Sequence, residues 1–216
     1  MLLALPDLCG ADLSGRVRVT KSLTRKKVSL NQVYERSVAL PAPNAESGTL
    51  AEELGRVVVY LEGNLPEPAP GRAEINQLQR RFEPEVLAIS AGSTVAFPNS
   101  DPVFHNVFSL SKAKAFDLGN YSRGQSRSVQ FQHPGIVLVH CHLHPNMNAA
   151  IVIAPNRFHV QPDAGGRFEL TGVPPGRYTA VAWHKSAGFF RRKIELKESS
   201  PTVLDFEIPL TEESAR

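Results

Sequence analysis

The sequence predicts an all-β protein built of two β-sandwiches. Short runs of β-branched and other apolar residues recur along the 216 residues, and 15 Gly and 17 Pro supply frequent turns between them. Residues 49–55 are the best candidate for a short helix, ended by a glycine. A chain of this length has room for one large or two small domains. Its content of 42% hydrophobic and 21% charged residues is that of a folded protein.

The expected strands fall into three groups. The first comprises residues 16–19 and 57–61 and is followed by a linker at residues 65–71, which holds three prolines. The second group lies between residues 86 and 153, where short apolar runs alternate with turns, as in a sandwich. Within it, the Pro134-Gly135 pair predicts a hairpin between the runs on either side. The third group, from residue 167 to residue 208, predicts a further small β unit with its own core.

Composition and charge exclude several classes of protein. Two cysteines rule out a disulfide scaffold and a four-cysteine zinc site within one chain. The net charge is +3 and dense basic runs are confined to residues 25–27 and 191–193, so we expect no nucleic-acid partner. The longest uncharged stretch, residues 128–156, is broken by prolines and histidines, which argues against a transmembrane segment. No Ser-His-Asp spacing, paired-acid signature or phosphate loop is present, and we therefore expect no enzyme.

The segment that carries chemistry is residues 140–147. It holds three of the seven histidines, one of the two cysteines and the single internal methionine. Cys141, His144 and Met147 form a C-x-x-H-x-x-M pattern between two expected strands, and thiolate, imidazole and thioether are donors suited to copper. His105, after the turn at residues 98–102, can supply the fourth ligand. Two His and one Cys with a weak axial Met form the trigonal set of electron-transfer copper sites.

Five motifs within residues 82–154 add a family resemblance. They are Phe82-Glu83-Pro84; Ala91-Gly92-Ser93-Thr94-Val95-Ala96-Phe97-Pro98-Asn99; His105-Asn106-Val107; Phe131 with Pro134-Gly135; and Cys141-His142-Leu143-His144-Pro145-Asn146-Met147. Together they resemble the cupredoxins, the blue copper proteins, and among them the amicyanin/plastocyanin-like and methylamine-utilisation-type proteins. The proline after His144 is the amicyanin-like feature.

This resemblance implies a Greek-key β-sandwich with one type 1 copper. The implied ligands are His105, Cys141, His144 and the axial Met147. Asn106 would tie the His105 loop to the cysteine loop. In the family, the imidazole that corresponds to His144 reaches the surface through an apolar patch, for which Pro102, Phe104 and Pro145 are the candidates here.

The remaining histidines receive separate interpretations. His142 is expected to point away from the metal and His140 to be structural. An auxiliary copper or zinc site from His133, His140 and His142 is the alternative for these residues. His159 and His184 are expected to be ordinary surface or edge residues.

The C-terminal segment has a resemblance of its own. The turn at residues 163–166, the following Arg167-Phe168-Glu169-Leu170 and the Val173-Pro174-Pro175-Gly176-Arg177-Tyr178 run look like the second half of a carboxypeptidase-regulatory-like, transthyretin-type β-sandwich. That family's first half begins with a Gly-x-Val strand, which Gly15-Arg16-Val17 matches. This module is usually a binding or rigidifying unit.

These observations divide the chain into four segments. They are residues 1–12, a signal remnant or a tail; 13–71, N-terminal strands and a proline-rich linker; 72–156, the copper domain; and 157–213, the second sandwich. Two arrangements stay open. Either residues 13–65 complete the second sandwich, with the copper domain nested inside it, or two domains follow one another and the N-terminal strands belong to the first.

The function expected from the sequence is that of a blue copper protein that carries electrons between redox partners in the bacterial periplasm or another exported compartment. Its redox protein partner is not identified by the sequence. Two alternatives remain: a copper-binding or delivery protein that uses the same ligands, and a cell-envelope interaction protein in which the C-terminal module acts.

Overall fold

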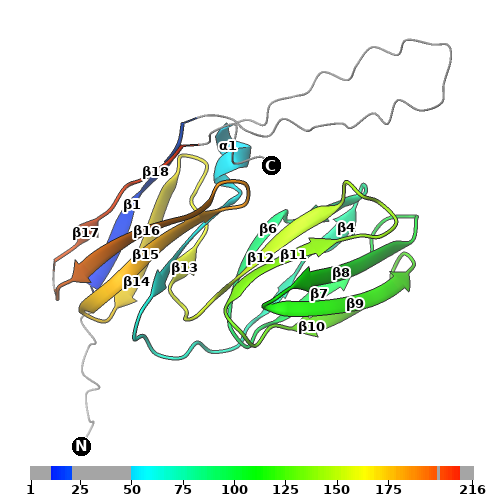
Figure 1. Cartoon of the computed structure of the whole chain (residues 1–216), viewed down its shortest axis with the longest axis horizontal. Coiled ribbons are helices and arrows are strands. Elements are labelled where there is room, and N and C mark those ends of the chain that lie inside the picture. The colour runs from blue at the N-terminus through cyan, green and yellow to red at the C-terminus, as the bar shows by residue number, and fades with distance from the viewer. Residues whose placement is uncertain (1–10, 21–49, 199, 210–216) are drawn as a thin grey trace, which may run out of the picture.

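The computed structural model describes residues 11–20, 50–198 and 200–209. Within these ranges the chain forms strands and one short helix (Figure 1). In order, the elements are β1 (Ala11–Val19), α1 (Leu50–Leu54), β2 (Val57–Glu62), β3 (Arg72–Glu74), β4 (Asn76–Leu78), β5 (Arg81–Glu83), β6 (Val86–Ser90), β7 (Thr94–Pro98), β8 (His105–Ser111), β9 (Lys114–Tyr121), β10 (Ser126–Gln130), β11 (Gly135–His140), β12 (Asn148–Ala154), β13 (His159–Val160), β14 (Arg167–Val173), β15 (Gly176–His184), β16 (Gly188–Leu196), β17 (Thr202–Val203) and β18 (Phe206–Ile208). The all-β class is confirmed. None of the described helical structure is long and apolar enough to cross a membrane.

The strands at the two ends of the chain build one sandwich together. β1 pairs antiparallel with β14 and parallel with β17 and β18, and the facing sheet has the order β13-β2-β15-β16. We call this unit, with α1 packed on it, the outer sandwich; it lies at the left of Figure 1. The N-terminal strands therefore pair with the C-terminal ones, which is the strand order of the nested arrangement. Likeness to the carboxypeptidase-regulatory family stays a prediction.

The strands between β2 and β13 form the inner sandwich, at the right of Figure 1. One sheet has the order β10-β7-β3 and the other β6-β12-β11-β8-β9, while β4 and β5 form a hairpin. The hairpin expected around Pro134-Gly135 is wrong, because β10 pairs with β7 and β11 pairs with β12 and β8. Pro134 has no amide hydrogen for a ladder and Gly135 adopts a φ of 147°, so the chain crosses from one sheet to the other at this point.

Four sheets are stacked, and in the middle two the strands β2, β15, β6 and β12 are apolar on both faces. In β2, Val57, Val59 and Leu61 enter the core of the outer sandwich, whereas Val58 and Tyr60 face the inner sandwich. Strand β12 repeats the pattern: Ala149, Ile151 and Ile153 enter the inner core, and Ala150, Val152 and Ala154 face outward against Val181 and Trp183 of β15. Alternate side chains of a strand point to opposite faces, so an uninterrupted apolar run is expected where both faces are covered.

The chain passes between the sandwiches at two neighbouring crossings. The outward crossing is the predicted proline-rich linker, residues 65–71. The return crossing is centred on Asn156, which is 2% exposed. Its Nδ2 donates to the Leu61 carbonyl at 2.8 Å and its Oδ1 accepts the Phe158 amide at 2.9 Å. A buried side chain thus joins the end of β2 to the start of the C-terminal strands.

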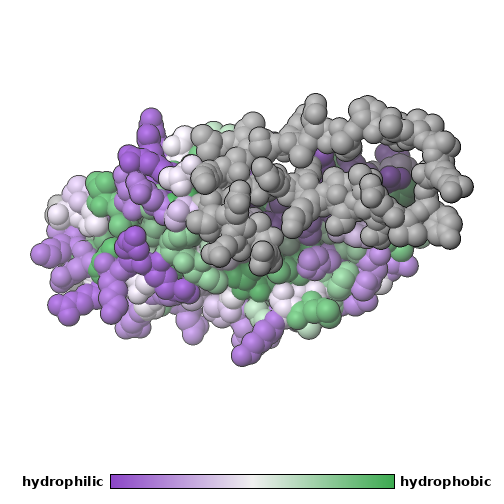
Figure 2. All heavy atoms as spheres, turned by 45° about the horizontal axis from the view of Figure 1, so that its top comes forward, coloured by the Kyte–Doolittle hydropathy of each residue, from purple (hydrophilic) through white to green (hydrophobic). Residues whose placement is uncertain are grey.

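The remaining expectations concern the short helix, the N-terminal tail and the two basic runs. The helix expected at residues 49–55 is confirmed as α1. β1 begins at Ala11, so the last two residues of the expected tail belong to a strand; the rest of that tail, the basic run at residues 25–27 and Thr49 lie outside the described residues. The second basic run lies on the edge strand β16. On the face seen in Figure 2, hydrophilic residues gather at the end formed by the outer sandwich.

Gly15 provides a test of the pairing between the two ends of the chain. A Cβ at this position would overlap the backbone carbonyl of Leu204, which neither rotates away nor moves without breaking the contact of β1 with the C-terminal segment. We expect Gly15→Ala to lower the free energy of unfolding by about 2–3 kcal/mol, measured by urea denaturation. Gly71→Ala is the control, because its Cβ would meet Ser93 Oγ at an ordinary 3.6 Å. Equal stability of the two variants would contradict this pairing.

Candidate metal centre

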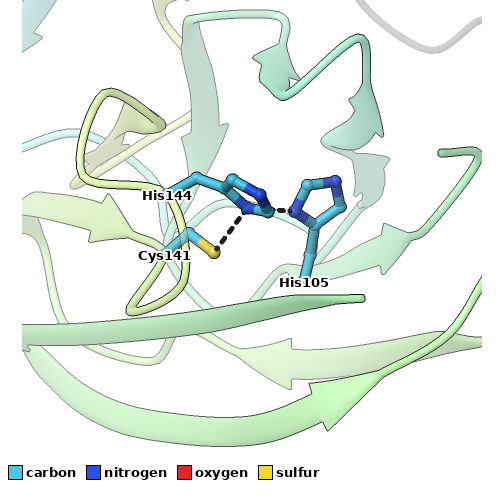
Figure 3. Close-up of side chains that lie close together, drawn as sticks. All are labelled: His105, Cys141 and His144. Atoms are coloured by element: carbon cyan, nitrogen blue, oxygen red, sulfur yellow. Dashed lines mark hydrogen bonds between the residues drawn. The ribbon is translucent and has the colours of Figure 1, made fainter. Parts of the chain in front are cut away.

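Three potential metal ligands converge at one end of the inner sandwich. Cys141 and His144 lie on the loop between β11 and β12, and His105 is the first residue of β8. His144 Nδ1 lies 3.0 Å from His105 Nδ1 and 3.8 Å from Cys141 Sγ, and the three donor atoms all lie within 4.8 Å of one another. Figure 3 shows the side chains pointing toward a common centre. This is the one group of three His, Cys, Asp or Glu donors within reach of a single ion in the described ranges.

The donor set fits copper. Metal–nitrogen and metal–sulfur bonds of about 2.0 and 2.3 Å place the donors of a trigonal site about 3.5–3.8 Å apart, so one ion can contact all three with small shifts. A thiolate with two imidazoles suits copper, zinc or an iron–sulfur site, and a nearby thioether favours copper among them. Cys141 forms no disulfide.

Asp101 fixes the orientation of His105. The His105 ring is fully buried, and its Nε2 lies 2.7 Å from Asp101 Oδ2. A carboxylate accepts from Nε2–H, which leaves Nδ1 with its lone pair directed toward Cys141 and His144. Asp101 is therefore what selects the ligand nitrogen of His105.

The orientation of Asp101 is itself fixed by the strained turn between β4 and β5. Gln79 and Arg80, between β4 and β5, have φ values of 53° and 56°, and their amides donate to the two carboxylate oxygens at 2.6 and 2.7 Å. Burial opposes ionisation of Asp101, but the two amides and His105 outweigh it and lower the pKa of the carboxyl. The carboxylate is thus the stable form of Asp101.

Asn106 ties the His105 strand to the cysteine loop. Its backbone amide donates to Cys141 Sγ at 3.4 Å, and its Oδ1 accepts the His142 amide at 3.4 Å. Its Nδ2 donates to Asp117 Oδ1 at 2.7 Å. Cys141 itself is 4% exposed, so the amide is a donor to sulfur in an apolar environment. Such a donor stabilises a thiolate.

His144 and Met147 complete the loop in different environments. Burial lowers the pKa of His144, and the charge of Arg80 adds to this effect, which favours the neutral imidazole that binds metals. The Met147 amide donates to the His144 carbonyl at 2.9 Å and closes a turn. Met147 is 1% exposed and belongs to the same buried cluster as Cys141. His144 is half-buried and lies where the loop meets the surface.

The other histidines of this region have neighbours of their own. The exposed ring of His142 stacks on Phe108 at 3.7 Å, with its Nε2 3.7 Å from Asp117 Oδ2. His140 packs against the same phenylalanine, with ring centroids 5.7 Å apart, and His133 is exposed between β10 and β11. The structure does not bring these three histidines into a common group of donors in the part of the chain it describes.

His184 is not the surface or edge residue expected from the sequence. It is fully buried, and its Nε2 lies 3.1 Å from Oε2 of the equally buried Glu53. Its Nδ1 accepts the amides of Ser186 and Ala187, which leaves the proton on Nε2. Burial lowers the pKa of His184. The expectation failed because Glu53 lies 131 positions away in the sequence. His159, on the edge strand β13, is half-buried and lies 3.1 Å from Ser90 Oγ.

Sequence reasoning also missed Asp101 and the turn that holds it. In the sequence, Asp101 is part of the turn at residues 98–102, and its position four residues before His105 is a usable signal. Gln79 and Arg80 carry no signal, because neither is a residue that usually marks a left-handed turn.

The comparisons with known proteins give the following. No protein-family model matches the chain, and no curated protein matches it. Among solved structures, a copper-containing nitrite reductase from Thermus scotoductus SA-01 is 25% identical over 41% of this chain and 23% of its own, with a TM-score of 0.36. A purple cupredoxin from Nitrosopumilus maritimus is 24% identical over 38% of this chain and 98% of its own, with a TM-score of 0.35. A reduced variant of amicyanin is 22% identical over 44% of this chain and 97% of its own, with a TM-score of 0.36.

The function of the chain must therefore be argued from the geometry of its own site. These solved structures match less than half of it, and none of the three scores reaches 0.5.

Asp101→Asn tests the interaction of the ionised Asp101 carboxylate with His105. Because the pKa of Asp101 is lower in the folded chain, ionised Asp101 contributes stability above the unfolded pKa of about 3.9, and this contribution is lost as the pH falls through the folded value. We expect the metal-free variant to be about 1–3 kcal/mol less stable than the parent chain at pH 7, and this difference to be smaller at pH 3, below the unfolded pKa of Asp101. Urea denaturation at both pH values measures this.

The control for this comparison is Glu74→Gln on β3. Glu74 is exposed and its substitution should change little at either pH. A stability difference for Asp101→Asn that is the same at pH 7 and pH 3 would refute the role assigned to the ionised carboxylate.

Proposed function

We propose that this protein is a type 1 copper protein that carries electrons between redox partners in the bacterial periplasm or another exported compartment, and that it is not an enzyme. The observation that supports it best is the convergence of one thiol and two imidazoles, each fixed by a separate contact. His105 is fixed by Asp101, Cys141 by the Asn106 amide, and His144 by the turn that its carbonyl makes with Met147. His105, Cys141 and His144 would hold the metal, with Met147 as the axial ligand.

Copper bound by these residues would supply one-electron exchange between Cu(I) and Cu(II). The chain's own contribution is to keep the donors in one arrangement. His105 and Cys141 are buried, and each has a hydrogen-bond partner in another part of the fold, Asp101 and the Asn106 amide, which restrains it. A donor set that does not move on a change of charge keeps the reorganisation energy small, which suits fast electron transfer.

The surface around His144 fits a docking site for a redox protein. Phe104 is 58% exposed and Leu143 is 45% exposed, and both adjoin a ligand in sequence. Pro102 and Pro145 are exposed as well. These apolar residues lie beside His144, the half-buried candidate ligand. A partner that docks on them would come close to the site without burying charged groups.

We propose an exported location because a protein with a thiolate ligand acquires copper most readily in a compartment where copper is available. A copper-delivery role is the alternative from the same ligands. The buried Cys141 and His105 disfavour it, since handing over an ion requires a partner's ligand to reach the metal.

Reconstitution with Cu(II) tests the electron-carrier proposal. We expect an intense blue thiolate-to-copper absorption, measured with visible spectroscopy and electron paramagnetic resonance. Cys141→Ser should abolish the band, whereas Cys9→Ser, the matched control, should retain it. A protein that binds Cu(I) but stays pale with Cu(II) would be a delivery protein, and the proposal would fail.

Met147→Leu tests the axial ligand. Removing a thioether that stabilises Cu(II) should leave the blue colour and raise the reduction potential, on the order of 60 mV for a tenfold change in relative affinity for the two oxidation states. Redox titration measures the potential. An unchanged potential would show that Met147 fills the core and nothing more.

Phe104→Glu tests the docking surface without knowledge of the partner. Electron self-exchange between two copies requires their His144 surfaces to meet, so a charge at this position should slow self-exchange at least about tenfold through like-charge repulsion. Nuclear magnetic resonance line broadening in mixtures of both oxidation states measures the rate. Val203→Glu, on an exposed apolar residue of the outer sandwich, is the control. Equal rates in both variants would place the docking surface elsewhere.

A further inference from the structure

The outer sandwich makes a direct polar contact with the end of the metal-binding loop. Lys185 follows β15 of the outer sandwich, and its ammonium group lies 2.6 Å from Asn148 Oδ1 and 3.5 Å from the Asn148 carbonyl. Asn148 comes directly after Met147 and opens β12. Its own Nδ2 donates to the Asn146 carbonyl at 3.1 Å, inside the loop. One side chain therefore connects the loop to a different sandwich.

Lys185 is itself held on three sides. Its backbone amide donates to the Arg56 carbonyl at 3.1 Å, and its ammonium group pairs with Glu85 Oε1 at 2.6 Å. The turn that carries it is fixed by buried His184, which accepts two amides of that turn. The Lys185 side chain is 13% exposed. A long flexible side chain has thus lost most of its freedom in the resting structure.

The anchor behind Lys185 is a neutralised ionic network between the sandwiches. Arg56 donates to Glu53 Oε1 at 3.0 Å and, through Nε and Nη2, to Glu85 Oε2 at 3.1 and 3.0 Å. Two carboxylates thus face two cations, Arg56 and Lys185. Burial opposes ionisation of Glu85, but Lys185 and Arg56 lower the pKa of its carboxyl. Glu85 also lies beside β12, since its carbonyl accepts the Ala150 amide at 2.9 Å.

We propose that Lys185 is a positioning residue for the metal centre: from the outer sandwich it holds Asn148, and through Asn148 it fixes the Met147 end of the loop. The part that concerns the metal rests on the proposed function. The outer sandwich then acts as a clamp on the loop at residues 141–147 and not only as a cover for the inner sandwich. Met147 is the ligand affected most, because it is the neighbour of Asn148.

Two readouts test this, one without copper and one with it. In Lys185→Met of the metal-free full chain, we expect amide hydrogen exchange at Met147 and Asn148 to be about tenfold faster, because a charged hydrogen bond to the loop is lost. In the copper-loaded chain, we expect about a threefold change in relative affinity for Cu(I) and Cu(II), about 28 mV at about 59 mV per tenfold. Lys185→Arg should restore both, since it keeps the charge and the donors.

The controls separate positioning from general stability. Lys193→Met, on the exposed strand β16, should change neither readout. Asn148→Ala removes the same contact from the loop side while leaving the Lys185–Glu85 pair, and it should reproduce the Lys185→Met result.

Other outcomes would contradict either the role of Lys185 or the proposed function. Unchanged exchange and potential in Lys185→Met would overturn the proposal, as would equally faster exchange throughout the chain, which would mark Lys185 as a stability residue. Faster exchange confined to the loop in a protein that shows no blue copper band would leave the clamp standing and overturn the proposed function instead.

Discussion

The whole molecule depends on the burial of four strands, β2, β6, β12 and β15, that are apolar on both faces. β2 and β15 of the outer sandwich pack against β6 and β12 of the inner one through Val58, Val152 and Trp183, among others. Separating the two units would expose this apolar surface, at a cost of about 25 cal/mol for each Å². Two sandwiches with separate cores are thereby joined into one body. Polar contacts of Asn156 and Lys185 add to this apolar interface.

The candidate metal centre also depends on contacts from outside the elements that carry it. Two of the three close donors, His105 and Cys141, are oriented by groups outside their own strand or loop. His105 depends on Asp101, which depends on a hairpin more than 20 residues earlier; Cys141 depends on an amide from β8; and the loop's end contacts the outer sandwich. The geometry of the donors is therefore a property of the folded chain, and a peptide of the loop would not reproduce it.

Local patterns carried most of what could be predicted from the sequence. The apolar runs at residues 57–61 and 149–154 identify strands, and their lack of alternation indicates burial on both faces. Three of the four candidate donors, Cys141, His144 and Met147, stand out because rare residue types are concentrated in one loop, a signal that needs no knowledge of the fold.

Long-range partners could not be predicted. Asp101 is an ordinary turn residue until Gln79 and Arg80 are brought to it, and His184 is an ordinary strand end until Glu53 covers it. The hairpin at Pro134-Gly135 failed for a related reason, because a proline–glycine pair marks a change of direction without specifying which sheet receives the next strand. In each case the contact that determines the structure joins residues that are too far apart in the sequence for a local pattern to reveal it.

The nesting of one sandwich within the other also orders events during synthesis. The inner sandwich, residues 72–154, is complete as soon as β12 has been synthesised. β1 can pair only later, because its partners include Asp205, which lies 189 positions after Arg16. Contacts of such sequence separation form slowly, because a long loop must close first. The inner sandwich shortens that loop when it folds, since its two ends lie at neighbouring crossings. The sandwich that carries His105, Cys141 and His144 is thus also the element that brings the two ends of the chain together.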